Sequence, residues 1–219
     1  MAKQTTIMIG VPTHDVLAAS FAQTITLCIE YMVRKGYKII PQFWEGTMVR
    51  DARTRLMETA IAKKVDYLFF IDSDMIVRPD VIERLIRDDC DIVSTKFFRR
   101  VEPFQPCFYL DIDTTKKPVE YLTPTKWADE GILKVKATGL AATLIRRKVL
   151  EAMPDDVFYH DPFCIGEDLQ FCVSAAERGF DVYVDLRLEA GHIARKVVTQ
   201  HTYLMYQEME ERKHDNKEK

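Results

Sequence analysis

The stretch Asp66-Tyr67-Leu68-Phe69-Phe70-Ile71-Asp72-Ser73-Asp74 decides the fold class and the place of the site. Its centre, residues 67–71, is continuously apolar, which predicts a parallel strand that is covered on both faces. Ligands of open α/β sheets bind beyond the carboxyl ends of such strands. Because residues i and i+2 of an extended segment point the same way, Asp72 and Asp74 can face one ion. Oxygen ligands favour Mg²⁺ or Mn²⁺. The alternative is that one aspartate caps the next helix and the other is solvated.

Strand and helix patterns alternate on both sides of this stretch. Apolar runs predict further strands at 7–11, 37–43 and 91–95. Helical periodicity predicts helices over 16–34 and 48–64, and Pro79 opens a third helix over 79–87. The order β-α-β-α-β-α-β over the first hundred residues implies parallel strands joined by right-handed crossovers.

The second half of the chain is less regular. Residues 97–134 predict loops and short edge strands, and 135–145 predict a strand in which Gly139 marks a close backbone approach or a bulge. Further patterns predict helices over 146–153 and 168–178, a strand over 181–185 and a helix from residue 198. We therefore expect a single domain over 1–200, followed by a C-terminal helix and charged tail over 201–219.

Composition narrows the class of protein. Of 219 residues, 47% are hydrophobic and 30% charged, which is typical of a globular chain with a buried core. The net charge of −3 provides no bulk attraction to nucleic acid or to an anionic membrane. No apolar run reaches the roughly 18–20 residues that span a bilayer, and no signal peptide is evident. The five scattered cysteines form no C-x-x-C pair, which indicates neither a zinc site nor a disulfide framework and favours a reducing cytosol.

Four blocks, in order, resemble glycosyltransferases of the GT-A fold, the family-2-like type that carries a D-x-D motif. The blocks are Arg53 with the stretch 66–74, the segment 137–147, the segment 166–172 and the segment 181–192. Thr54 stands where this family often has Asn. The resemblance implies an α/β fold with a Rossmann-like nucleotide-sugar-binding half over 1–96, its mostly parallel sheet flanked by helices. A smaller mixed half over 97–200 would hold the acceptor and the metal, as in bacterial and phage enzymes.

The resemblance also implies a set of metal ligands. Asp74, Asp72 and His192 would hold a divalent ion that neutralises the diphosphate leaving group. An imidazole ligand favours Mn²⁺ over Mg²⁺. The alternative for His192 is a histidine of a surface loop.

The donor site takes further residues from the first strand and the second helix. Pro12, Thr13 and Asp15 would form the edge that binds base and ribose, although Asp15 can equally cap a helix. Ser73 lies in the same site, between the two carboxylates.

Two arginines of the second predicted helix, Arg50 and Arg53, would contact the nucleotide or its phosphates through their forked donors. The alternative is a solvated helix face.

A carboxylate pair supplies the candidate general base. An inverting transferase needs a base that takes the acceptor's hydroxyl proton, and Asp168 is the first choice, with Glu167 second. Acidic residues are also common in the first turn of a helix, which is the alternative. In a retaining enzyme the pair would hold a sugar instead. The aromatic segment 97–109, with Arg99 and Arg100, lines an acceptor cleft or packs in the core.

The predicted function is therefore metal-dependent transfer of a sugar from a nucleotide sugar, with UDP-sugar favoured, to a hydroxyl group. A saccharide or small metabolite is the favoured acceptor, and a hydroxymethylated DNA base is a minority option because the chain is net negative. We expect no membrane insertion and a location in the cytoplasm of a bacterium or an infected host cell.

Three other classes remain as alternatives. A HAD-like phosphohydrolase with an aspartyl nucleophile also carries D-x-D after a strand, but usually after its first strand. A sugar nucleotidyltransferase would show a Gly-rich basic loop after the first strand, where this chain has 10–14, Gly-Val-Pro-Thr-His. A catalytically inactive sugar-binding module would not need the two aspartates and the histidine.

Overall fold

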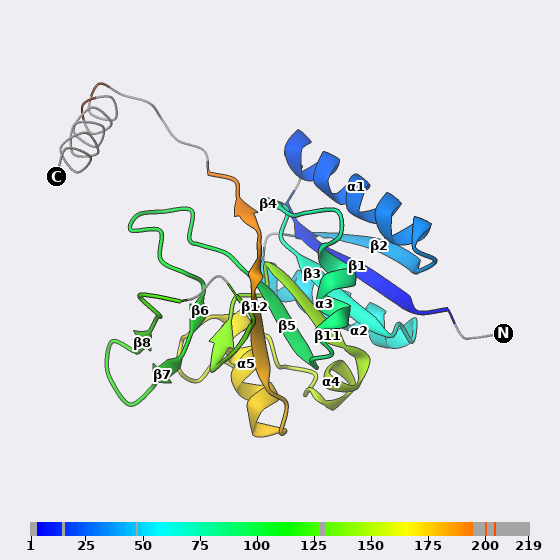
Figure 1. Ribbon diagram of the computed structural model, residues 1–219. Coiled ribbons are helices and arrows are strands. Elements are labelled where there is room, and N and C mark those ends of the chain that lie inside the picture. The colour runs from blue at the N-terminus through cyan, green and yellow to red at the C-terminus, as the bar shows by residue number, and fades with distance from the viewer. Residues whose placement is uncertain are drawn as a thin grey trace.

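The computed structural model describes residues 4–14, 16–46, 48–127 and 130–194, together with positions 200 and 204. These residues form a seven-stranded mixed sheet with helices on both faces (Figure 1). In spatial order the strands are β2 (Lys38–Glu45), β1 (Thr6–Thr13), β3 (Tyr67–Ile71), β11 (Ala142–Arg146), β5 (Ile92–Lys96), β12 (Val182–Glu189) and β9 (Ile132–Val135). Five strands run in one direction, and β11 and β9 run against them. The prediction of an α/β fold with a mostly parallel sheet is confirmed.

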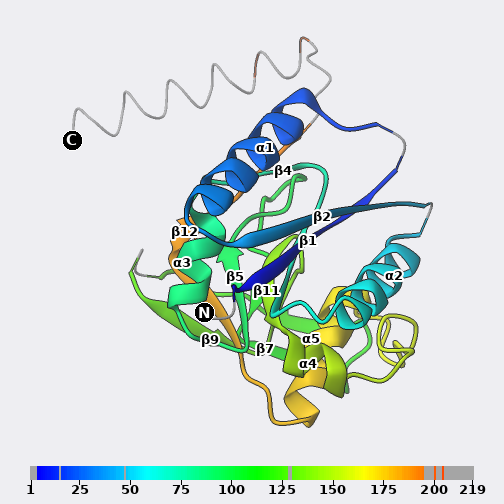
Figure 2. The same ribbon diagram turned by 90° about the vertical axis from the view of Figure 1, so that its right-hand side faces the viewer.

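Strand β3 lies inside the sheet and is buried on both faces, as its continuous apolar run predicts. Leu68 and Phe70 belong to one core cluster, and Phe69 and Ile71 to the other. The first face is covered by α2 (Val49–Ala62), α4 (Arg147–Ala152) and α5 (Glu167–Glu177), and the second by α1 (Ala19–Arg34) and α3 (Val81–Arg87) (Figure 2). Because successive side chains of β3 point to opposite faces of the sheet, the strand packs into both core clusters immediately before the D-x-D stretch begins.

The neighbours of β3 differ from the sequence expectation. We expected uninterrupted parallel strands, but β11 is inserted antiparallel between β3 and β5, with Ala142 opposite Ile71 and Thr143 opposite Ser94. The physical reason is that periodicity identifies a strand without identifying the strand it pairs with.

The single strand expected over 135–145 is wrong, because three short pieces take its place. Strand β9 ends at Val135, β10 comprises Ala137–Thr138 and pairs with β6 (Phe108–Tyr109), and β11 starts at Ala142. A Cβ at Gly139 would lie 2.8 Å from the Phe97 ring. Gly139 thus marks a close backbone approach, one of the two expected reasons for a glycine there.

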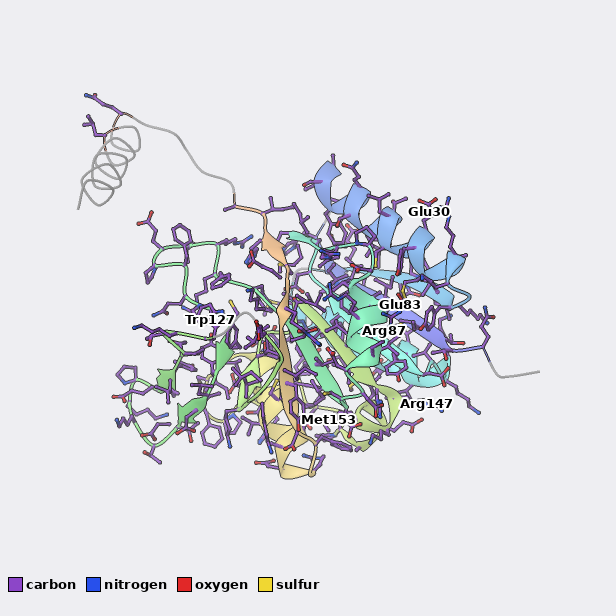
Figure 3. All side chains as sticks on the ribbon, in the orientation of Figure 1. Glu30, Glu83, Arg87, Trp127, Arg147 and Met153 are labelled. Atoms are coloured by element: carbon purple, nitrogen blue, oxygen red, sulfur yellow. The ribbon has the colours of Figure 1, made fainter. Side chains whose placement is uncertain are left out.

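Residues 97–134 are mainly loops and short strands, as expected. Strand β7 (Asp111–Asp113) pairs with β8 (Glu120–Leu122) in a separate two-stranded sheet. Trp127, labelled in Figure 3, packs against Phe108 and Phe98 with ring centroids 5.7 and 5.9 Å apart. Phe108 belongs to the same core cluster as Phe70, so Trp127 packs the end of the segment against the body of the fold.

The structure describes little of the C-terminal helix and tail that the sequence predicts. Apart from positions 200 and 204, the helix expected from residue 198 and the tail over 201–219 fall outside the described residues.

Across the described ranges, no helix has both the length and the apolar character that crossing a membrane requires.

Candidate functional site

The two carboxylates of the D-x-D stretch sit in a tight turn at the end of β3. The backbone N–H of Met75 donates to the carbonyl of Asp72 at 3.1 Å, and that turn leads into β4 (Met75–Ile76). Strand β13 (Gly191–His192) pairs antiparallel with β4, which places His192 opposite Met75. Ile193 N–H also donates to the carbonyl of Asp74 at 2.7 Å. The pairing of these two strands therefore places His192 next to Asp74, although the two residues lie far apart in the sequence.

The His192 ring lies between a carbonyl and a carboxylate. Its Nδ1 is 2.9 Å from the Phe98 carbonyl and its Nε2 is 3.2 Å from Asp74 Oδ2. A carbonyl oxygen only accepts, so Nδ1 carries a proton, and Nε2 of a neutral ring then turns a lone pair toward the carboxylate. Two acceptors that face each other need a cation between them, either a proton on Nε2 or a metal ion.

The protein environment favours charge at this pair. The hydrogen bond to Asp74 raises the pKa of His192. Burial acts to raise the pKa of Asp74, but the hydrogen bond and charge of His192 and the charge of Arg100 together hold it below its usual range. Asp74 is thus an anion that attracts cations.

A second cluster centres on Arg53 of α2. Its side chain is only 3% exposed, its Nη2 donates to Asp72 Oδ1 at 3.1 Å, and its Nη1 lies 3.4 Å from Glu167 Oε1. The guanidinium lies over the Phe70 ring, 5.9 Å from its centroid. The buried guanidinium of Arg53 therefore orients the carboxylates of Asp72 and Glu167.

Asp168 lies in the first turn of α5, and Gly166 takes the N-cap position with φ of 98°. Asp168 Oδ1 accepts the backbone N–H of Leu169 at 2.8 Å, and a Cβ at Gly139 would lie 3.3 Å from its Oδ2. Burial raises the pKa of Asp168 to about 6, and the Glu167 charge adds to this while Arg53 opposes it. The group is ionised at neutral pH and is a stronger base than an ordinary aspartate.

Two pockets open at this edge of the sheet, and Asp72 lines both. The larger, about 760 Å³, is also lined by Pro12, Thr13, Ser73, Asp74 and Arg100. The smaller, about 260 Å³, is also lined by Asp168, His192, Gly139, Arg99, Tyr109 and Tyr121. The carboxylates thus stand where a large ligand and a small one would meet.

Most of the expected site residues that the structure describes lie together at this edge of the sheet, and a few lie apart from them. Five of the residues assigned to the donor site line one pocket: Pro12, Thr13, Asp72, Ser73 and Asp74. Asp15 lies outside the described residues.

The two arginines expected to contact the nucleotide or its phosphates lie in different environments. Arg53 is buried beneath Asp72, where it is shielded from a ligand in the pocket. Arg50 lies over the Tyr159 ring, 5.2 Å from its centroid, and lines neither pocket. The Arg53 side chain is 3% exposed and packs on the body of the protein, whereas the Arg50 side chain is 46% exposed.

The expected metal ligands are only partly assembled. Asp74 and His192 are in contact, whereas Asp72 is paired with Arg53. Within the ranges that the structure describes, no three His, Cys, Asp or Glu side chains form a group that could hold an ion.

Several residues of the site had no sequence signal of their own. Arg100 was grouped with the acceptor segment, but it lines the larger pocket and donates to Asp74 Oδ2 at 2.7 Å. Tyr121 joins Tyr109 in the smaller pocket with ring centroids 5.2 Å apart. The aromatic segment divides, because Phe97 and Tyr109 line that pocket while Phe108 belongs to the core and Phe104 is exposed.

The chain is similar in fold to A197 from STIV. The two are 18% identical with a TM-score of 0.57, over 88% of this chain and 87% of that chain. No protein-family model matches the sequence, and no curated protein matches it. At this identity the likeness shows a shared fold and leaves activity to the residues of the site.

Two other solved structures overlap less closely. A glycosyltransferase involved in the glycosylation of the major capsid of PBCV-1 is 13% identical with a TM-score of 0.43, over 74% of this chain and 72% of that chain. S. aureus TarS 1–349 is 10% identical with a TM-score of 0.42, over 89% of this chain and 59% of that chain.

Proposed function

We propose that this protein is a metal-dependent glycosyltransferase of the GT-A type, which moves a sugar from a UDP-sugar to a hydroxyl group of an acceptor. The observation that carries the proposal is the pair of pockets that meet at Asp72. The pocket of about 760 Å³ is large enough for a nucleotide sugar, and the pocket of about 260 Å³ suits one small ring. In this proposal residues 1–96 supply the donor half and residues 97–200 the acceptor half.

The donor side would hold the ion on Asp74 and His192, which are in contact, and on Asp72, which would have to turn away from Arg53 to reach it. His192 Nε2 lies 3.2 Å from Asp74 Oδ2, and this nitrogen–oxygen donor set suits Mn²⁺, with Mg²⁺ as second choice. Bound there, the ion supplies electrostatic stabilisation of the diphosphate leaving group. Arg53 keeps Asp72 in place, because its guanidinium is fixed by burial and by contacts to two carboxylates.

The acceptor side would use Asp168 as the general base. It lines the smaller pocket, and a pKa of about 6 leaves it ionised at neutral pH while strengthening it as a proton acceptor. Glu167 is the second choice because its carboxylate is held by Arg53. With Asp168 as base the transfer would invert the transferred sugar carbon, whereas in a retaining transfer the pair Glu167 and Asp168 would hold a sugar instead.

The acceptor class follows from the smaller pocket. Tyr121 is half-buried beside the buried Tyr109, and its ring is one on which a sugar or a planar ring can pack. We favour a saccharide or a small metabolite, and a hydroxymethylated DNA base stays the minority option.

The aspartyl phosphohydrolase is the weaker candidate. It needs a lysine beside the nucleophile, and among the described residues that line the two pockets there is none. Asp72 is moreover held by Arg53, which lowers its availability for attack.

A thermal-shift screen of nucleotides and nucleotide sugars tests the proposal. UDP should raise the melting midpoint by about 5 °C at a hundred-fold excess over its Kd, and only with Mn²⁺ present. Asp74→Asn should abolish the shift. Asp80→Asn is a matched control, because Asp80 also pairs with an exposed arginine, Arg78 at 3.0 Å, but lies outside both pockets.

Two outcomes would count against the proposal. A UDP shift that persists in EDTA would remove the metal dependence. No shift with any nucleotide or nucleotide sugar would remove the transferase.

A further inference from the structure

Arg99 differs from the other arginines of the fold in its charge partners. Among the described residues, every other arginine has an aspartate or glutamate oxygen within ion-pair distance, and Arg99 has none. Its Nη2 donates to the Tyr109 hydroxyl at 3.4 Å, which is longer than an ordinary N–H···O bond. Since a guanidinium carries five N–H donors, most of its binding capacity is unused in the protein.

The position of Arg99 gives this spare capacity a direction. Arg99 lines the smaller pocket, as Asp168 does, and its backbone N–H donates to the Gln105 carbonyl at 2.9 Å, which fixes the start of the side chain. Burial raises the pKa of the Cys107 thiol to about 12, and the charges of Arg99 and Asp168 act on that thiol in opposite directions. The two charges therefore lie close enough for one small ring in the pocket to contact both.

The two carboxylates that line this pocket are held by other groups. Asp72 is paired with Arg53 at 3.1 Å, and Asp168 Oδ1 accepts the Leu169 N–H at 2.8 Å. Neither carboxylate lies within ion-pair distance of Arg99. The guanidinium therefore stays available for an anion that enters the pocket as part of a ligand.

We propose that Arg99 selects an acidic sugar as the acceptor. This role rests on the proposed function and narrows its acceptor to a sugar ring that carries a carboxylate or a phosphate group. The anionic group binds the guanidinium, whose forked donors match two oxygens of either group. The ring packs on Tyr121, and one of its hydroxyl groups faces Asp168.

The chemistry of the transfer stays that of the proposed reaction. The acceptor's hydroxyl oxygen forms the new glycosidic bond and its proton passes to Asp168, while UDP leaves with the electron pair of the bond that breaks. Arg99 takes no part in these steps. It sets which ring is held with its hydroxyl group against the base.

Three methyl glycosides that differ only at carbon 6 test the selection. The glucoside, the glucuronide and the glucoside 6-phosphate are titrated by NMR against the protein without nucleotide or metal ion, and the galacto series is titrated in parallel. At least one acidic ring should bind about 10-fold more tightly than its neutral counterpart, because it adds a hydrogen bond between charged groups. The tighter of the two acids identifies the anionic group. An increase in NaCl from about 0.05 to about 0.5 M should weaken only the acidic rings.

Arg99→Gln should remove this preference, so that acidic and neutral rings bind alike. Arg99→Lys should keep part of it, because the charge remains without the forked donors. Arg55→Gln is the matched control. Arg55 is 59% exposed, pairs with Glu58 at 3.0 Å and lines neither pocket, so this variant should keep the full preference of the wild type.

Each result bears on one of the two assignments. Equal affinity for acidic and neutral rings, or binding of none of them, overturns the selection by Arg99. An acid preference that persists in Arg99→Gln overturns it as well. If the preference depends on Arg99 but no nucleotide or nucleotide sugar shifts the melting midpoint, the acidic-sugar site stands and the proposed transferase fails. A nucleotide shift without any acid preference leaves the transferase and removes only the role of Arg99.

Discussion

Replacement of Asp168 by asparagine isolates its role as a base. The asparagine would keep the size of the side chain and an Oδ1 that accepts the Leu169 N–H, a bond of 2.8 Å in this structure. The asparagine amide cannot take the hydroxyl proton of the acceptor, as the Asp168 carboxylate can. Turnover should fall by about 10²- to 10⁴-fold, the usual contribution of general base catalysis, which corresponds to about 3–5 kcal/mol of barrier. Affinity for the donor should hardly change, because Asp168 lines the smaller pocket and not the larger.

The pH profile gives a second reading of the same residue. Burial raises the pKa of Asp168 to about 6, so the base is protonated and inactive below that pH and active above it. The kcat/KM of the wild type should therefore rise through about pH 6. The residual activity of Asp168→Asn should lack this rise.

The assay is steady-state release of UDP with an identified acceptor, paired with donor titration by calorimetry. Glu167→Gln is the companion variant, because Glu167 neighbours Asp168 but is held by Arg53. Near wild-type turnover in Asp168→Asn would refute the assignment, and a loss confined to Glu167→Gln would move the base by one residue.

Three further predictions concern the support of the site and the stability of the fold. Arg53→Ala should lower the free energy of unfolding by about 3 kcal/mol, because it removes a buried guanidinium and leaves the partly buried carboxylates of Asp72 and Glu167 unpaired, whereas Arg55→Ala on the same helix, 59% exposed, should cost under about 1 kcal/mol in urea titrations. Gly139→Ala should cost about 1–3 kcal/mol and reduce turnover, because its Cβ would stand 2.8 Å from the Phe97 ring and 3.3 Å from Asp168 Oδ2; a variant with wild-type stability and rate would contradict the close approach. Burial, together with the Asp185 charge, raises the pKa of Asp88 to about 6, so the folded state holds that proton more tightly than the unfolded chain and loses this advantage as the pH rises through 6. Asp88→Asn should therefore gain stability over the wild type at about pH 8 and lose that gain toward about pH 4, and parallel pH curves for the two proteins would exclude this effect.

Much of the donor pocket could be predicted because its residues follow strands. The apolar run 67–71 identified a central strand, and the chain direction then placed Asp72, Ser73 and Asp74 at the ligand-binding edge. Pro12 and Thr13, the last two residues of β1, reached the same edge for the same reason.

The other side of the site depends on contacts that no local pattern encodes. The sequence placed Arg53 on a helix face, but only packing shows that this face lies beneath Asp72. In the same way, β11 looks like any strand until its pairing with β3 and β5 is known. Arg99 and Arg100 are adjacent in sequence and yet line different pockets, because successive side chains of the segment point to opposite sides.

The most direct test is a crystal structure of the protein with Mn²⁺ and UDP, with data collected at the manganese absorption edge. We expect an anomalous peak at about 2.0–2.3 Å from the oxygen and nitrogen ligands, bound by Asp74 and by His192 Nε2, with the diphosphate beside it in the pocket of about 760 Å³. Asp74→Asn should lose the peak. UDP bound elsewhere, or bound in this pocket with no manganese at Asp74, would contradict a metal-dependent glycosyltransferase centred on this carboxylate.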